Sequence, residues 1–183
     1  NGQDPTGAST VYSGPILLNA NSVLKAKCFP LLTTSLPSAT ATETYFFMED
    51  FTIPVISITT DPTNLYGPTG IFDNYTTDWR KPCVIEYFDG DGVKQFESRA
   101  SIKPDGGAGG SRSNPQHSVT IEPAHNLYGE GEPVHYPLIP EKGFINDFYA
   151  FYLRNGSNMW NQYPQKDATF MRIMRETNAN SQA

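Results

Sequence analysis

The sequence predicts a mostly β protein of the α+β class, in which a partial immunoglobulin-like β-sandwich is followed by an antiparallel β unit with one C-terminal helix. Three observations predict it. Glycine and proline contribute 15 residues each to a chain of 183, which favours turns over long helices. The apolar runs, such as residues 54–58, have the length of strands. Only one segment, near the C-terminus, repeats its apolar residues at helical spacing.

The first unit, residues 1–49, contains short strand candidates separated by turn-forming residues. Residues 23–29 alternate apolar and polar side chains, as a half-buried strand does. Several short strands between turns are typical of part of an immunoglobulin-type sandwich. So short a piece buries a thin core, and we expect it to pack on something else. The strand candidates are residues 11–12, 16–18, 23–29 and 42–47.

The second unit, residues 50–183, begins with a dense apolar strand at 53–59. Residues 79–97 predict a β-hairpin because Asp89-Gly90 is a preferred turn dipeptide between two strands. The helix is expected from Pro164 to about residue 177, since proline suits the first helical position. Further strands are expected at residues 98–102, 117–122 and 148–153. A turn at residues 61–64 follows the first strand, and residues 123–143 are expected to form an irregular surface segment.

Composition excludes several classes of function. Lys and Arg number 13 against 19 Asp and Glu, so the net charge of −6 argues against a nucleic-acid partner. No apolar run reaches the ~18 residues of a membrane-spanning helix. The chain has no initial Met, no signal-peptide character at its start and no closing core segment at its end, so we expect a mature protein or a piece cut from a longer one.

The two cysteines, Cys28 and Cys83, are too few for a zinc site built on paired thiolates. In an exported protein they would be able to form one disulfide, and two buried thiols are the alternative. Cys28 alternates with Leu24 and Ala26, which predicts that it faces the core of the sandwich. We expect free thiols.

The glycine-rich loop at 105–112 is the best candidate for a small anionic ligand. Consecutive glycines let backbone N–H groups converge on an anion, and Arg112 would add a bidentate contact to phosphate. The loop lacks the P-loop signature, and a hairpin loop without a ligand is the alternative that we favour. The candidate anion-binding residues here are Gly109, Gly110, Ser111 and Arg112.

Metal and hydrolase sites are not expected. The spacing of the three histidines, His117, His125 and His135, places no two of them on one helical turn. Asp89 and Asp91 lack the other ligands of a calcium loop, and a tight turn explains them.

Aromatic residues in a glycine- and proline-rich stretch are candidates for stacking on a sugar. They are Tyr66, Tyr75 and Trp79, and packing within the core or between units is the alternative. Asn74 and Asn155 fit the pattern of glycosylation acceptors, although the pattern is common by chance. For Asn155 we favour a structural role.

Residues 1–48 resemble the chitobiase/β-hexosaminidase C-terminal-type module. The resemblance is carried by the start Asn1-Gly-Gln-Asp-Pro-Thr-Gly-Ala-Ser-Thr-Val-Tyr-Ser-Gly-Pro-Ile, then by Val23-Leu-Lys-Ala-Lys-Cys-Phe and Thr44-Tyr-Phe-Phe. It implies a small immunoglobulin-like domain of the kind found beside secreted carbohydrate-active enzymes and in bacterial surface proteins. The first strands of that family are absent here.

Residues 52–183 resemble the N-terminal part of the spore-coat protein H (CotH) kinase-like family. The resemblance is carried by Ile56-Ser-Ile-Thr-Thr-Asp-Pro-Thr-Asn-Leu-Tyr, Gly70-Ile-Phe, Trp79-Arg-Lys-Pro-Cys-Val-Ile-Glu-Tyr-Phe, Gly109-Gly-Ser-Arg and Tyr152-Leu-Arg-Asn-Gly-Ser-Asn-Met-Trp. It implies an atypical kinase that uses ATP and magnesium. His117 stands near the place of a family lysine, which adds it to the anion-binding candidates, and Lys166-Asp167 replaces an Arg-Asp pair. The family's later half, with its metal-holding carboxylates, is absent, so we expect no cofactor and no complete catalytic site in this chain.

These observations predict a fragment of a secreted or cell-surface bacterial protein that acts as a structural or self-associating scaffold. Strand edges left open at either end would invite pairing with another protein chain. An ATP- and magnesium-dependent kinase of the CotH family and a carbohydrate-binding module are the two alternatives.

Overall fold

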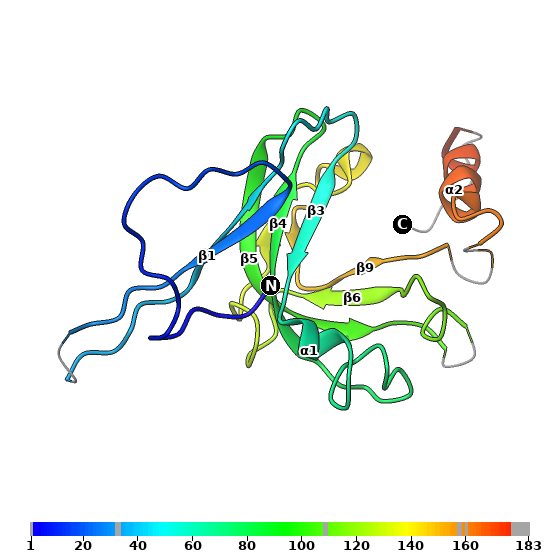
Figure 1. The fold of residues 1–183 in the computed structure, drawn as a ribbon. Helices are drawn as coiled ribbons and strands as arrows, with labels where there is room; N and C mark the ends of the chain where they lie inside the picture. The colour runs from blue at the N-terminus through cyan, green and yellow to red at the C-terminus, as the bar shows by residue number, and fades with distance from the viewer. Residues whose placement is uncertain (1, 32–33, 108–109, 157–158, 160, 177–183) are drawn as a thin grey trace.

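The computed structural model describes residues 2–31, 34–107, 110–156, 159 and 161–176 (Figure 1). It is mostly β: nine strands form three antiparallel sheets, and helices are few and short. The largest sheet is curled like half of a barrel. This confirms the predicted mostly β class, whereas the immunoglobulin-like detail stays a prediction.

The main sheet has five strands in the order β3-β4-β5-β6-β9. The hairpin of β4 and β5 is its centre, as the Asp89-Gly90 turn predicts. In that turn the Asp89 carboxylate accepts hydrogen bonds from the backbone N–H groups of Asp91 (3.0 Å) and Val93 (2.9 Å). The strands are β3 (Val55–Thr59), β4 (Lys81–Phe88), β5 (Lys94–Pro104), β6 (Val119–Glu122) and β9 (Phe151–Leu153).

The hydrophobic core covers one face of this sheet, because alternate residues of a strand point to the same side. Ile85 of β4, Ile121 of β6 and Ile71 from the loop before β4 are fully buried there. The aromatic rings of Tyr87, Phe96 and Tyr136 pack together at one end of the same face. The remaining core residues are Cys83, Ala100, Ile102, Val119 and Val134.

Residues 2–49 form an N-terminal arm that extends away from the main sheet, to the left in Figure 1. Its two strands, β1 (Ser22–Ala26) and β2 (Ala41–Tyr45), make a sheet of their own. The strands predicted at 11–12 and 16–18 are wrong: that stretch has no regular secondary structure and pairs with no neighbouring strand among the described residues.

The remaining elements are short. α1 (Pro62–Leu65), where the sequence predicts only a turn, begins at the N-cap Asp61, whose side chain accepts a hydrogen bond from the Thr63 N–H. α2 (Lys166–Glu176) lies within the predicted C-terminal helix. Between them lie β7 (Val134–His135), the 3₁₀ turn η1 (Pro140–Lys142) and β8 (Asp147–Phe148). None of the helices described is long and apolar enough to cross a membrane.

Both cysteines are free thiols. Cys83 is buried in the core, and this burial raises the pKa of its thiol to about 12. The prediction that Cys28 faces a core is wrong, since Cys28 lies beyond the end of β1 and is exposed, as is Ala26.

Candidate functional site

Two loops at one end of the main sheet bring the predicted site residues together. The first is residues 66–79 and the second is residues 105–118. The rings of Phe72 and His117 stack with their centroids 4.0 Å apart, and Tyr66 meets Phe72 edge-on at 5.6 Å. The candidates for anion binding and for sugar binding therefore share one place in the fold.

Arg112 ties the second loop to the first. Its Nη2 donates to the Asp78 carboxylate at 2.8 Å, and its Nη1 donates to the backbone carbonyls of Tyr75 (3.4 Å) and Thr77 (3.3 Å). The hydrogen bond from Arg112 to Asp78 and the positive charge of Arg112 lower the pKa of Asp78. His117 adds a contact within the second loop, with Nδ1 2.9 Å from the Arg112 carbonyl oxygen. The positive charge of Arg112 is thus paired with an exposed carboxylate of the first loop.

The glycine-rich loop directs its hydrogen bonds inward. The N–H of Gly110 donates to the Gly107 carbonyl and the N–H of Ser113 to the Gly110 carbonyl, each at 3.0 Å. The Ser111 hydroxyl donates to the Asp105 carbonyl at 3.1 Å. Gly109 lies outside the described residues. These contacts support the reading of the loop as a closed turn, because the N–H groups of Gly110 and Ser113 point at carbonyls of the loop itself.

The aromatic candidates differ in exposure. Tyr66 and Trp79 are 55% and 43% exposed, whereas Tyr75 is half-buried. The ammonium of Lys81 lies 5.9 Å from the centre of the Trp79 ring, which is the range of a cation–π contact. Tyr66 and Trp79 are therefore the two rings that a flat ligand would be able to reach.

The two predicted glycosylation acceptors are engaged within the fold. The side-chain amide of Asn74 donates to the Gly70 carbonyl at 2.8 Å. Asn155 is 2% exposed, its amide nitrogen donates to the Gln116 carbonyl, and its oxygen accepts from the Ser118 hydroxyl at 2.9 Å. A glycan at either nitrogen would have to replace these contacts, which support structural roles for both residues.

A second polar site, which sequence reasoning missed, joins the arm to the face of the main sheet opposite the core. We call this the outer face. At the centre of this site is Glu86 of β4, only 1% exposed. Its carboxylate accepts hydrogen bonds from the Thr44 N–H (3.1 Å) and the Thr44 hydroxyl (2.5 Å) of β2. The hydroxyls of Thr44 and Ser57 lie 2.7 Å apart. We call these residues, with Glu43, Lys94 and Glu97, the arm seam.

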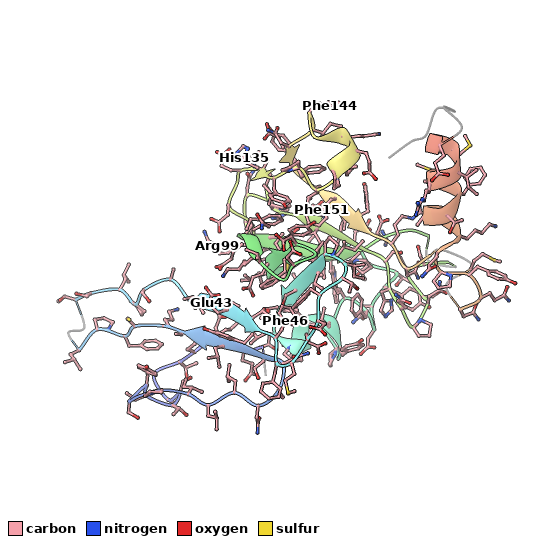
Figure 2. The ribbon with its side chains drawn as sticks, turned by 90° about the horizontal axis from the view of Figure 1, so that it is seen from above. Glu43, Phe46, Arg99, His135, Phe144 and Phe151 are labelled. Atoms are coloured by element: carbon pink, nitrogen blue, oxygen red, sulfur yellow. The ribbon has the colours of Figure 1, made fainter. Side chains whose placement is uncertain are left out.

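Lys94 supplies the positive charge of the arm seam. Its Nζ lies 2.6 Å from the Glu43 carboxylate, 3.3 Å from Glu97 and 3.4 Å from Glu86. Burial alone would lower the pKa of Lys94, but the hydrogen bonds to Glu43 and Glu97 raise it above its ordinary value. Figure 2 shows Glu43 and Phe46 where the arm meets the main sheet. The signal in the sequence was a single glutamate inside the apolar run 83–88.

An ion pair also fixes the outer face near the two loops. Arg80 donates through Nε (2.7 Å) and Nη2 (3.2 Å) to the two carboxylate oxygens of Glu122, which also accepts from the Ser101 hydroxyl at 2.6 Å. Burial alone would raise the pKa of Glu122, but these hydrogen bonds lower it to about 2. The pair fastens the start of β4 to the end of β6.

Among the described residues, no three His, Cys, Asp or Glu side chains gather to hold a metal ion. No family model matches the chain, and neither the curated proteins nor the solved structures contain a match. The chitobiase-type and CotH-like resemblances therefore stay predictions from the sequence, as do the ATP and magnesium that the second one implies.

Proposed function

We propose that this chain is a structural module of a secreted or cell-surface protein and that it associates with another protein chain through the N-terminal arm. The observation that carries the proposal is the apolar surface that the arm leaves in water. A protein seldom exposes so many large apolar side chains on one segment unless a partner covers them. The side chains, 57–102% exposed, are Val11, Tyr12, Ile16, Leu17, Leu31 and Leu36.

The backbone of the arm supports the same proposal. The sheet of β1 and β2 has two strands, so each strand has an outer edge that faces no third strand among the described residues. Such an edge offers backbone donors and acceptors to a strand of another chain. A lone two-stranded sheet is also only marginally stable in water, so pairing with a partner would stabilise it.

Sedimentation velocity over a wide concentration range tests the proposal. We expect concentration-dependent association of the wild type, weakened about tenfold or more when Leu17, Leu31 and Leu36 are all changed to Gln, because each leucine loses the burial that association provides. The matched control changes two apolar residues of similar exposure outside the arm, Leu127→Gln and Phe144→Gln. A wild type that is monomeric throughout, or an equal loss in the control, would contradict the proposal.

A second candidate function is carbohydrate binding at the two loops. The exposed rings of Tyr66 and Trp79 favour it, because sugars stack on open aromatic faces. A glycan array should then show hits that disappear with Trp79→Ala and persist with Tyr152→Ala, which removes an aromatic ring 63% exposed on β9. An array without hits, or equal loss in both variants, would exclude this function.

A further inference from the structure

We infer that the N-terminal arm is exchanged between two copies of this chain, so that β2 of each copy binds the outer face of the main sheet of the other. The inference rests on the proposed function and deepens it, because it names the partner of the arm as a second copy, and it adds that the arm seam is the contact which the two copies exchange.

The arm seam contains the chemistry that such an exchange needs. Glu86 is a buried carboxylate, and a buried charge is stable only with donors aimed at it. Within the seam, Thr44 of the arm supplies two of these donors, and Glu43 supplies a carboxylate for Lys94. The arm of a second copy offers the same groups in the same order. Exchange therefore replaces each contact by an identical one between chains, which is the basis of domain swapping.

The start of the arm is joined to its strand β1. The ammonium of Lys25 in β1 donates to the Gly2 carbonyl at 2.7 Å and to the Asp4 carboxylate at 2.9 Å. Gly2 itself sits against the carbonyl of Thr60, so closely that a Cβ there would lie 2.2 Å from the carbonyl oxygen. An exchanged arm would take Gly2 to the same place on the second copy.

The segment between Phe46 and Val55 is the hinge, because it contains no helix or strand. Met48 there has φ 55°, and no other non-glycine residue described has a positive φ. An L-residue with a side chain is strained in that left-handed region and relaxes when the chain becomes extended. Asn21 holds the bent form, accepting from the Phe47 N–H at 2.7 Å. Strain in a short hinge favours exchange, since opening removes it.

An aromatic contact next to the hinge would form again in the exchanged state. Phe46, directly after β2, meets Phe88 of β4 edge-on with the ring centroids 4.9 Å apart. Phe46 also meets Phe51 at 4.8 Å. Figure 2 places Phe46 at the junction of arm and sheet. Because Phe88 belongs to the sheet and Phe46 to the arm, the pair forms equally well within one chain or between two.

A disulfide trap distinguishes the two states. The Thr44 and Ser57 hydroxyls lie 2.7 Å apart, so sulfur atoms at these positions can reach bonding distance. The test variant is Thr44→Cys with Ser57→Cys, and Cys28→Ser removes the exposed native thiol. The full chain is concentrated, oxidised and separated by size, and each species is analysed on a denaturing gel without reductant. The control carries Val84→Cys and Arg99→Cys, which face each other on β4 and β5 of one chain.

In the exchanged dimer we expect the 44–57 disulfide to link two chains, whereas the 84–99 control stays within one chain. A dimer whose 44–57 disulfide lies within each chain would overturn the exchange and leave the proposed association standing. A chain that stays monomeric at every concentration, with all disulfides internal, would overturn both.

Met48→Gly provides a second test that leaves the arm seam intact. Glycine adopts a positive φ without strain, so this variant should stabilise the closed monomer and lower the dimer association constant about fivefold. Met48→Ala keeps the strained backbone and is the matched control, expected to dimerise like the wild type. An unchanged association constant in Met48→Gly would overturn the role of the hinge in exchange.

Discussion

A single buried carboxylate determines how the arm meets the main sheet. Glu86 lies on the outer face of β4, opposite Ser57 of β3 and Glu97 of β5 in the strand register. Without the hydrogen bonds from Thr44, the Glu86 carboxylate would be a charge removed from water with only Lys94 nearby. Such a buried charge destabilises the folded state. The arm seam thus gives the arm one specific position on the sheet, which apolar contacts alone would not specify.

At this scale we predict that Glu86→Gln lowers the free energy of unfolding by about 2 kcal/mol, because the buried amide presents donors to the donors of Thr44 and Lys94. Glu97→Gln is the matched control, since Glu97 is 40% exposed and contacts the same lysine. We expect it to change the free energy by less than about 0.5 kcal/mol. Urea denaturation measures both. Equal losses in the two variants would contradict the assigned role of Glu86.

The ion pair of Glu122 predicts that the free energy of unfolding depends on pH in the acidic range. The pKa of Glu122 is lowered to about 2 in the folded protein, against 4.5 for an ordinary glutamate. The unfolded state therefore binds the proton more readily, so the stabilisation is complete above pH 4.5 and is lost as the pH falls toward 2.

We expect the free energy of unfolding to fall by roughly 2–3 kcal/mol over this range through Glu122. Urea denaturation at pH 6, 4 and 3 should show a smaller fall in Glu122→Gln, which has no carboxylate to protonate. Parallel curves for the wild type and the variant would show that Glu122 is not responsible.

At the scale of elements, the parts of the fold that depend on local chemistry were predictable. The β4–β5 hairpin was predicted from Asp89-Gly90 because the turn needs no distant partner. Strands at 11–12 and 16–18 were predicted on the same kind of pattern and are wrong, since a strand also needs a neighbour to pair with. α1 was missed because a helix of four residues beginning with Asp61-Pro62 has the sequence of a turn.

The candidate sites were predictable only where their residues are close in sequence. Ser111, Arg112 and His117 were proposed together and lie in one loop, but the acceptors of Arg112 come from residues 75–78. The arm seam joins Thr44 to Glu86, which are 42 residues apart, and only strand packing brings them together. Nothing in the local pattern around Thr44 indicates that contact.

The hairpin turn itself gives a prediction at this scale. Gly92 has φ 77°, and a Cβ there would lie 2.6 Å from the Phe51 ring. Gly92→Ala should therefore lower the free energy of unfolding by about 2 kcal/mol through strain and overlap. Gly90→Ala, two residues earlier with open space around its Cβ, should change it by less than about 0.5 kcal/mol. Thermal or urea unfolding compares the two, and equal losses would contradict the described turn.

At the scale of the whole molecule, the protein divides into a packed sheet and an arm of very different stability. The core residues lie on β4, β5, β6 and β7 and in the loop before β4, whereas none of the described arm residues is both apolar and buried. Thr42 is the one arm residue that is fully buried among those described. The position of the arm therefore depends on the arm seam, on its own two-stranded sheet and on the contacts of Gly2 with Thr60 and of Phe46 with Phe88.

This division predicts the order of backbone amide exchange with deuterium. Amides of β1 and β2 should exchange at least about a hundredfold faster than those of β4 and β5, because a two-stranded sheet on a polar seam opens without unfolding the core. The difference should shrink at high protein concentration, where association protects the arm. Peptide-level mass spectrometry resolves the two regions. If the amides of β1 and β2 exchange with deuterium as slowly as those of β4 and β5 in dilute solution, the arm belongs to the same cooperative unit as the sheet. The arm would then not open to bind another chain, which would contradict the swapping of arms between two copies.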